Sequence, residues 1–240
     1  MSAHGGVRRA SAGRAAGRGS ACARAGAAAC LALLAGGLAG GCNYLIPASY
    51  LIEGPPKEPA RYELPRRKTV VYVDDRANRM TRAALRTAVG EEVGTLLLQQ
   101  ALVPEVVSTR DSVAYARRVD TSDKQVSIRK IGEAVGAEQV VYIDIDEFRI
   151  TADGATPRAA AIVNVKVIDV GSGARLWPDG TDEGERMVIR TREQSLELYN
   201  SSAGRRKVED ALAKQVAEDV SKLFYEHEKR ELGGNLGIRN

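Results

Sequence analysis

The sequence predicts an α/β (α+β) fold: a single mixed β-sheet of about five strands, covered by helices and closed by a long C-terminal amphipathic helix. A buried-strand pattern over 68–73 is followed by apolar residues at helical spacing. Two longer apolar runs, 139–150 and 159–170, follow each other directly. One apolar stripe then runs through 202–229, formed by Val208, Leu212, Val216, Val220, Leu223 and Phe224. Strands that alternate with helices and end in a strand meander form a mixed sheet with helices on one or both faces.

The first half of this domain alternates strands and helices. β-Branched residues dominate 68–73, which is typical of a buried strand. Thr81 is the predicted N-cap of the helix that follows, whose apolar positions are Leu85, Val89, Val93, Leu96 and Leu97. Pro104 ends this helical segment, and a short strand is expected over 105–108. One or two short helices are expected in the polar stretch that follows, and 128–135 is the better of them.

The second half reads as a meander of strands. The run 139–150 is the strongest strand signal in the chain, and 159–170 is the next. The turn Gly171-Ser172-Gly173 supplies the positive φ angles of a tight hairpin. The return strand is expected to start at 174–177, and a further strand at 185–191.

The N-terminal segment differs in composition from the rest of the chain. Residues 1–41 contain five arginines and no Asp or Glu, and Ala25 to Leu38 is almost entirely Ala, Leu and Gly. Together with the ending Leu38-Ala39-Gly40-Gly41-Cys42, this order resembles a bacterial lipoprotein signal peptide. The resemblance implies cleavage before Cys42, a thioether-linked diacylglycerol on its sulfur, and fatty acids such as palmitate in the lipid anchor. Asn43 at the next position favours the periplasmic face of the outer membrane. The alternative is a transmembrane anchor, but the segment 25–41 is shorter than the roughly 20 strongly apolar residues that a span needs.

Cleavage at this point changes the charge of the protein. The whole chain has a formal charge of +4, and the leader contributes five positive charges, so the mature chain has 30 − 31 = −1. The basic isoelectric point therefore belongs to the leader and does not indicate nucleic-acid binding. The mature chain keeps only Cys42 of the three cysteines, which excludes an intramolecular disulfide.

The sequence divides the mature chain into three parts. Residues 42–65 comprise the lipidated cysteine and a Pro-rich tether, and the segment 53–65, which contains the clustered prolines, cannot be helical. Within it, Tyr44-Leu45-Ile46 and Tyr50-Leu51-Ile52 suit either the lipid headgroup zone or a docking surface on protein, and both alternatives stay open. The folded domain is expected over 66–232, and 233–240 is a polar tail.

Two segments of the domain carry a family resemblance. Residues 134–143 end a helix in Gly-Ala before a buried strand, and residues 161–177 contain Val-Ile-Asp-Val-Gly-Ser-Gly-Ala-Arg-Leu-Trp. This pattern is similar to that of the curli-secretion-channel lipoproteins, the penicillin-binding-protein activator lipoproteins and the N-terminal domain of the Tol propeller protein. The resemblance implies a protein-binding accessory of envelope assembly or secretion, with an envelope protein as partner and a homo-oligomer left open. The alternatives are a subunit of an oligomeric export pore and a hydrolase with a dispersed carboxylate site.

The residue inventory predicts that the chain is not an enzyme. His227 is the only histidine after the leader, and it is expected to be solvated at the polar end of the last helix. The sequence contains no Gly-x-Ser-x-Gly elbow, P-loop or dinucleotide-binding glycine turn. We therefore predict no catalytic residue, no cofactor and no metal ligand, and Cys42 as the one modified residue.

Two aspartates in the strongest strand are candidate ligands or acid/base groups. Asp144 and Asp146 lie two residues apart, which places their side chains on one face of the strand and Glu147 on the other. They would form either a cation site or acid/base pair, or a solvated face paired with basic neighbours such as Lys166. The second alternative is favoured because the apolar residues between them already face the core.

Three further features have both a structural and a functional explanation. Asp74 and Asp75 end the first strand, where α/β folds often bind ligands, although loop-forming aspartates are commoner there. The basic run Arg205-Arg206-Lys207 opens a helix and is expected to be a solvated face. Trp177 is expected to be packed at the end of a strand.

Overall fold

The computed structural model describes residues 56–121, 124–151, 158–180 and 183–229. The chain divides into two compact units, Met1–Pro56 and Lys57–Asn240. The predicted signal peptide, Cys42 and the two Tyr-Leu-Ile segments lie outside the described residues, so they remain predictions. Among the described helices, none has both the length and the apolar composition needed to cross a bilayer.

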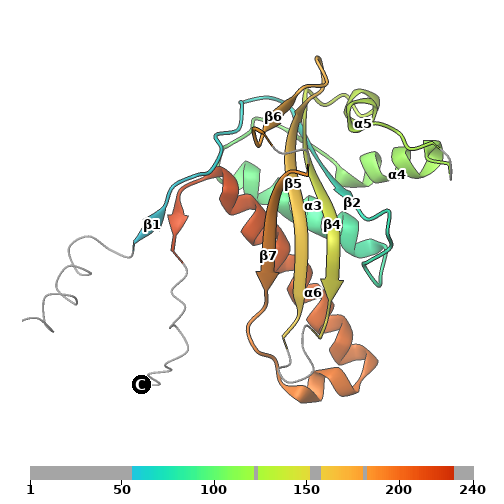
Figure 1. Cartoon of the computed structure of the whole chain (residues 1–240), viewed down its shortest axis with the longest axis vertical. Helices are drawn as coiled ribbons and strands as arrows, with labels where there is room; N and C mark the ends of the chain where they lie inside the picture. Colours follow the sequence, from blue (N-terminus) through green and yellow to red (C-terminus); the bar gives the residue numbers. More distant parts are fainter. Residues whose placement is uncertain (1–55, 122–123, 152–157, 181–182, 230–240) are drawn as a thin grey trace, which may run out of the picture. The chain divides into compact units, whose positions relative to one another are not determined.

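A six-stranded mixed sheet forms the centre of the second unit, as Figure 1 shows. Its strands are β2 (Thr69–Asp74), β3 (Val106–Val107), β4 (Gln139–Arg149), β5 (Ala160–Asp169), β6 (Arg175–Trp177) and β7 (Glu185–Arg190). They are arranged β3-β2-β4-β5, and β6 and β7 both pair with the remaining side of β5. β2 is parallel to β3 and β4, and the other pairs are antiparallel. The predicted α/β class with a mixed sheet is confirmed.

Helices cover the two faces of the sheet to different extents. On one face, α3 (Ala84–Gln99) and α6 (Ser202–Ser221) pack against all the long strands and form the larger core. On the other face, α4 (Thr109–Val119) and α5 (Ile128–Ala134) cover only β2 and the adjacent part of β4 and β5, where they form a smaller core.

The uncovered part of the second face is a distinct surface, which we call the open face. In Figure 1 it is the lower part of β4, β5 and β7, in front of α6. On this face, side chains of β4, β5 and β7 that lie opposite each other in the strand pairing form rows across the sheet. The open face consists of Asp144, Asp146, Glu147, Arg149, Ala160, Ile162, Asn164, Lys166, Arg186, Val188 and Arg190.

Local signals explain most helix starts. Serine side chains cap three helices, because Ser108, Ser127 and Ser201 each accept a hydrogen bond from a backbone N–H in the first turn. The predicted cap of the long first helix is wrong: α3 begins after Ala83, and no side chain caps it. In the predicted hairpin turn, the Asp169 carboxylate accepts hydrogen bonds from the backbone and the hydroxyl of Ser172.

The last helix is shorter than predicted. α6 ends at Ser221, and the chain continues through η3 (Lys222–Phe224) into β8 (His227–Glu228), which pairs with β1 (Lys57–Glu58). The backbone N–H groups of Arg61 and Tyr62 both donate to the Leu223 carbonyl, at 2.8 and 3.1 Å. A segment from the other end of the unit thus satisfies a carbonyl that a longer helix would have bonded.

The same contacts show that the folded unit starts before Arg66. Leu64 is buried in the larger core, and Tyr62 stacks on Trp177 with ring centroids 5.8 Å apart. Trp177 also meets Phe224 edge to face at 6.2 Å. Residues 57–64, assigned to the tether by their prolines, therefore pack on the domain, and Trp177 is packed as predicted.

Candidate functional site

A buried polar cluster lies at the carboxyl end of β2, beside the first half of the parallel strand β4. Asp74 is 1% exposed, and its carboxylate accepts a hydrogen bond from the Tyr142 hydroxyl at 2.9 Å. The guanidinium of Arg76 lies 3.2 Å from the same carboxylate, and that of Arg86 lies 4.0 Å away. Arg86 also donates to the Val73 carbonyl, and Arg76 to the Val126 carbonyl. These contacts tie the end of β2 to the start of α3 and to the segment before α5.

The tyrosines of this cluster are held in their neutral form. Burial, and then the negative charge of Asp74, raise the pKa of Tyr142. The same causes raise the pKa of Tyr72 to about 12. The Tyr72 hydroxyl has no hydrogen-bond partner among the described residues. The two rings lie 6.0 Å apart between the sheet and α4.

Asp75 has a structural role in the same loop. Its carboxylate accepts hydrogen bonds from the backbone N–H groups of Arg79 and Met80, at 2.6 and 3.0 Å. The loop-forming alternative predicted for Asp75 is therefore correct. Within the described ranges, no group of three or more His, Cys, Asp or Glu side chains is placed to hold a metal ion.

The second predicted carboxylate group, on β4, lies on the open face. Asp144 pairs across the strands with Asn164, and an ion pair of 2.8 Å joins Asp146 to Arg186 of β7. Burial and the nearby Asp74 carboxylate raise the pKa of Asp144, whereas Lys166 opposes this rise. Asp146 fits the favoured alternative of an exposed carboxylate paired with a basic neighbour, whereas Asp144 is half-buried beside Asn164.

The predicted position of Glu147 is wrong. The pairing of β4 with β5 shifts between Ile145 and Glu147, so that Glu147 lies opposite Ile162, which is on the open face. Such a bulge inserts one extra residue and reverses the alternation of side chains beyond it. Three acidic side chains of β4 therefore share the open face, and not two.

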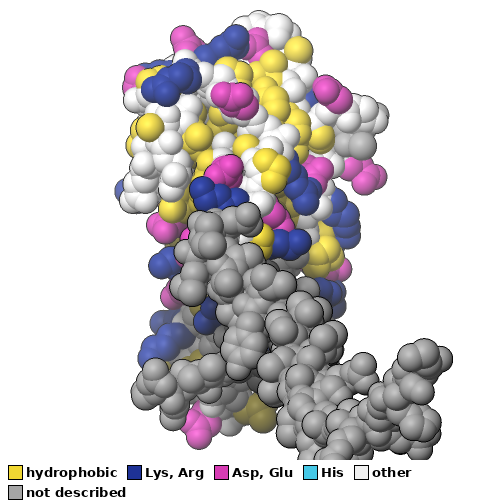
Figure 2. Space-filling view, turned by 90° about the vertical axis from the view of Figure 1, so that its left-hand side faces the viewer, with side chains coloured by type: hydrophobic (Ala, Val, Ile, Leu, Met, Phe, Trp, Pro, Cys, Tyr) yellow, Lys and Arg dark blue, Asp and Glu magenta, His cyan; other side chains and the backbone are white. Residues whose placement is uncertain are grey.

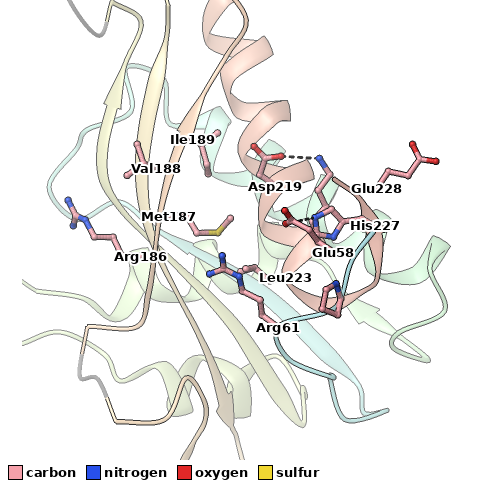
Figure 3. Close-up of a pocket in the computed structure, with 12 residues that line it drawn as sticks. Glu58, Arg61, Arg186, Met187, Val188, Ile189, Asp219, Leu223, His227 and Glu228 are labelled. Carbon is pink, nitrogen blue, oxygen red and sulfur yellow. Dashed lines mark hydrogen bonds and ion pairs between the residues drawn. The ribbon is translucent and has the colours of Figure 1, made fainter. Parts of the chain in front are cut away.

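A groove that the sequence did not predict lies beside the outer edge of β7. Its cavity measures about 370 Å³ and lies between β7 on one side and η3, β1 and β8 on the other. Figure 3 shows Met187 and Ile189 pointing to the side of the groove where Leu223 lies, and Arg186 and Val188 pointing away from it. The rim is charged: Lys222 is ion-paired with Asp219 at 3.1 Å, and Arg61 is ion-paired with Glu185.

His227 belongs to this groove and not to the end of a helix. It lies in β8 with a side chain that is 18% exposed, and its Nε2 atom is 3.6 Å from a Glu58 carboxylate oxygen. Its Nδ1 atom lies 3.1 Å from the Tyr225 carbonyl oxygen. The predicted solvated histidine is therefore wrong, because the pairing of β8 with β1 brings the ring against the domain. The basic run of Arg205, Arg206 and Lys207 is exposed as predicted.

The edge of β7 presents backbone groups to this groove. The Thr191 N–H donates to the Ala159 carbonyl at 3.0 Å, next to the β5–β7 pairing. In an antiparallel pair the residues alternate between bonding inward and bonding outward. The N–H and C=O groups of Arg186, Val188 and Arg190 therefore point to the outer edge, where no described residue bonds them.

The surface around this edge carries charges of both signs. Figure 2 shows basic and acidic side chains side by side on this side of the molecule, with apolar side chains gathered in its upper part. Val188 is 53% exposed, which makes it one of the few large apolar side chains that are mostly exposed among the described residues. The sequence signal for this site was present but weak: the last strand that the sequence predicts is the run Glu185-Arg186-Met187-Val188-Ile189-Arg190.

Comparisons with known proteins give fold likeness at low identity. No protein-family model and no curated protein sequence matches the chain. Among solved structures, a PelC dodecamer from Paraburkholderia phytofirmans is 15% identical over 71% of this chain and 96% of its own, with a TM-score of 0.39. The lipoprotein GNA1162 of Neisseria meningitidis is 15% identical over 63% of this chain and 99% of its own, with a TM-score of 0.38. A protein of Xanthomonas campestris is 11% identical over 70% of this chain and 86% of its own, with a TM-score of 0.41.

The names of these structures do not decide the function of this chain. One of the three is a lipoprotein by name, and none is named as a curli-secretion, penicillin-binding-protein activator or Tol protein. That finer resemblance stays a prediction. At such TM-scores the likeness carries no argument about function, so the function depends on the residues of this chain.

Proposed function

We propose that this chain is a lipid-anchored envelope protein whose α/β unit binds a partner protein through the groove and the adjoining edge of β7. The groove carries the proposal, because it combines an apolar floor at Met187 and Leu223, a charged rim, and backbone groups at the edge. Protein-binding surfaces share this composition of an apolar centre and a polar rim. The location that goes with it is the periplasmic face of the outer membrane, with Cys42 as the lipidated residue.

Binding without catalysis fits the way in which the titratable groups are used. His227 is placed beside Glu58 and the Tyr225 carbonyl oxygen, and Asp74 is buried among arginines and a tyrosine. Asp146 is paired with Arg186 on the open face. Each of these groups has a partner that fixes it, which supports a structural role for them.

The anchor is tested by the variant Cys42→Ser. The wild-type protein should incorporate a labelled palmitate in cells and sediment with membranes. The variant should take up no label and should leave the membrane fraction or stay uncleaved, because Cys42 is the only cysteine that remains after cleavage. Label recovered in the variant would contradict the lipoprotein assignment.

The binding site is tested by a photo-crosslinking residue introduced into the full anchored protein in cells. Position 187 lies in the groove, and position 110 on α4 is an exposed control distant in the sheet order. We expect a discrete adduct with another envelope protein from position 187 and none of that size from position 110. The same adduct from both positions, or from neither, would exclude the groove as the binding site.

A further inference from the structure

We infer that the partner supplies an extended segment that adds to β7 as a further strand, with acidic side chains beside Arg186 and Arg190. This inference rests on the proposed function and names the mode of binding and the chemistry of the partner. In such strand addition, main-chain hydrogen bonds provide affinity and alternate side chains provide specificity.

The backbone of the edge is suited to one more strand. The outward N–H and C=O groups belong to Arg186, Val188 and Arg190, which span most of the strand. At the start of β7, the ion pair between Glu185 and Arg61 bounds this stretch. An edge of this kind is a template for pairing with another chain unless it is blocked.

The side chains at the edge define two environments for an added strand. Met187 and Ile189 face the groove with Leu223, so that the residues opposite them would enter an apolar setting. Arg186, Val188 and Arg190 face the opposite side, on the open face. A strand that satisfies both would carry apolar residues at its centre and opposite charges at its two outer positions.

Charge is distributed unequally across the open face, and this identifies the partner as acidic. The acidic side chains Asp144, Asp146 and Glu147 all lie on β4, whereas the edge strand contributes two arginines and no acid to this face. Arg186 is partly neutralised by Asp146. Arg190 is exposed, and no described residue forms an ion pair with it.

The same charges oppose a second copy of this chain as the added strand in the register centred on Val188. Antiparallel pairing of two β7 strands centred on Val188 would place Arg186 opposite Arg190 of the other copy, twice. Like charges directly opposite each other destabilise a strand pair, and edge charges are a common device against self-association. The two arginines of the edge therefore destabilise this pairing with a second copy and favour an acidic segment.

The test uses the full-length lipoprotein in detergent and three labelled peptides. The first is Ser-Glu-Leu-Val-Leu-Glu-Ser, whose palindromic sequence presents the same side chains in parallel and antiparallel pairing. The second replaces both Glu by Lys, and the third replaces the central Val by Pro. Only the first should bind in a fluorescence anisotropy titration.

Matched variants of the protein separate strand addition from other contacts. Val188→Pro removes an N–H that points outward and leaves the bonds to β5 in place, so it should abolish binding of the acidic peptide. Val188→Thr keeps that N–H and should bind as the wild type does. Arg190→Glu should weaken the acidic peptide by about tenfold and favour the basic one. The fluorescence of Trp177 during denaturant unfolding checks that each variant is folded.

Hydrogen exchange gives a direct signature. On addition of the acidic peptide, the amides of Arg186, Val188 and Arg190 should exchange more slowly, whereas the amide of Met187, which points to β5, should be protected throughout. Equal binding of the acidic and basic peptides, no binding to folded protein, or binding without protection of these three amides would overturn the inference. If the adduct from position 187 persists in the Val188→Pro background, strand addition fails while the proposed binding function stands.

Discussion

The two ends of the sheet use the same residue type for opposite purposes. At the closed end, where α3 and α4 cover both faces of β2, Asp74 is 1% exposed and is held by Tyr142 and two arginines. At the open end, Asp146 and Arg186 form an ion pair with side chains that are 43% and 52% exposed. Coverage by helices therefore decides whether an aspartate on this sheet forms a buried cluster in the interior or an exposed ion pair on the surface.

The largest expected effect is the loss of Asp74. Asp74→Ala would leave the Tyr142 hydroxyl and the guanidinium of Arg86 buried without their carboxylate, which typically costs about 3–5 kcal/mol of unfolding free energy. The matched change at the open end, Asp146→Ala, should cost at most about 1 kcal/mol, since both partners are exposed.

Denaturant unfolding followed by the fluorescence of Trp177, the single tryptophan, measures both variants. Asp74→Asn serves as a control, because its amide oxygen can still accept from Tyr142 while the charge is lost. The unfolding free energy of Asp74→Asn should lie between those of the wild type and Asp74→Ala. If Asp74→Ala and Asp146→Ala lowered the unfolding free energy by similar amounts, the proposed difference between the closed and the open end of the sheet would be wrong.

A second comparison uses valines. Val140 is fully buried in the smaller core at the closed end, and Val188 is exposed at the open end. Val140→Ala removes buried methyl groups and leaves a small cavity, at a cost of about 2 kcal/mol. Val188→Ala should change the unfolding free energy by less than about 0.5 kcal/mol. A large loss for Val188→Ala would mean that the open face is covered in the folded protein.

The sequence predicted β2, α5 and the glycine turn after β5, because the signals for these elements act within a few residues. The serine caps of α4 and α5 are equally local and were not predicted. Burial of Val70, Val71 and Val73 follows directly from the β-branched run of β2. Loop formation by Asp75 is equally local, since its acceptor role involves only the next five residues.

The open end and the groove depended on contacts between distant residues. The end of α6 is set by Arg61 and Tyr62, whose N–H groups bond Leu223 from far along the chain. The position of Glu147 depends on a bulge, which no pattern of alternation reveals. His227 was assigned to a helix end because the pairing that moves it, between β8 and β1, joins the two ends of the unit.

A third prediction uses the raised pKa of Tyr72 at the closed end. Its pKa is about 12 in the folded protein and about 10 when unfolded, so the unfolded chain releases the proton first as pH rises. Stability from this group is intact below pH 10 and falls between about pH 10 and pH 12, by about 1 kcal/mol at pH 11. Tyr72→Phe should lack this contribution and keep that of Tyr142, whose pKa is also raised, so its unfolding free energy should decrease less than that of the wild type. If the difference in unfolding free energy between the wild type and Tyr72→Phe were the same from pH 8 to pH 11, the pKa of Tyr72 would not be raised in the folded protein.

The smallest expected effect concerns cations at the open end. Asp144 and Asp146 are each engaged by neighbours, Asp144 with Asn164 and Asp146 with Arg186, so neither is arranged around a common ion. The melting temperature of the wild type should therefore not change when calcium, magnesium or manganese is added. A bound ion would instead add about 2.7 kcal/mol at a hundredfold excess over its Kd. The control is the double variant Asp144→Asn with Asp146→Asn. A rise in melting temperature that the wild type shows and this variant lacks would show that the open face binds a cation. Fewer acidic groups of the open face would then be left to balance the arginines of β7.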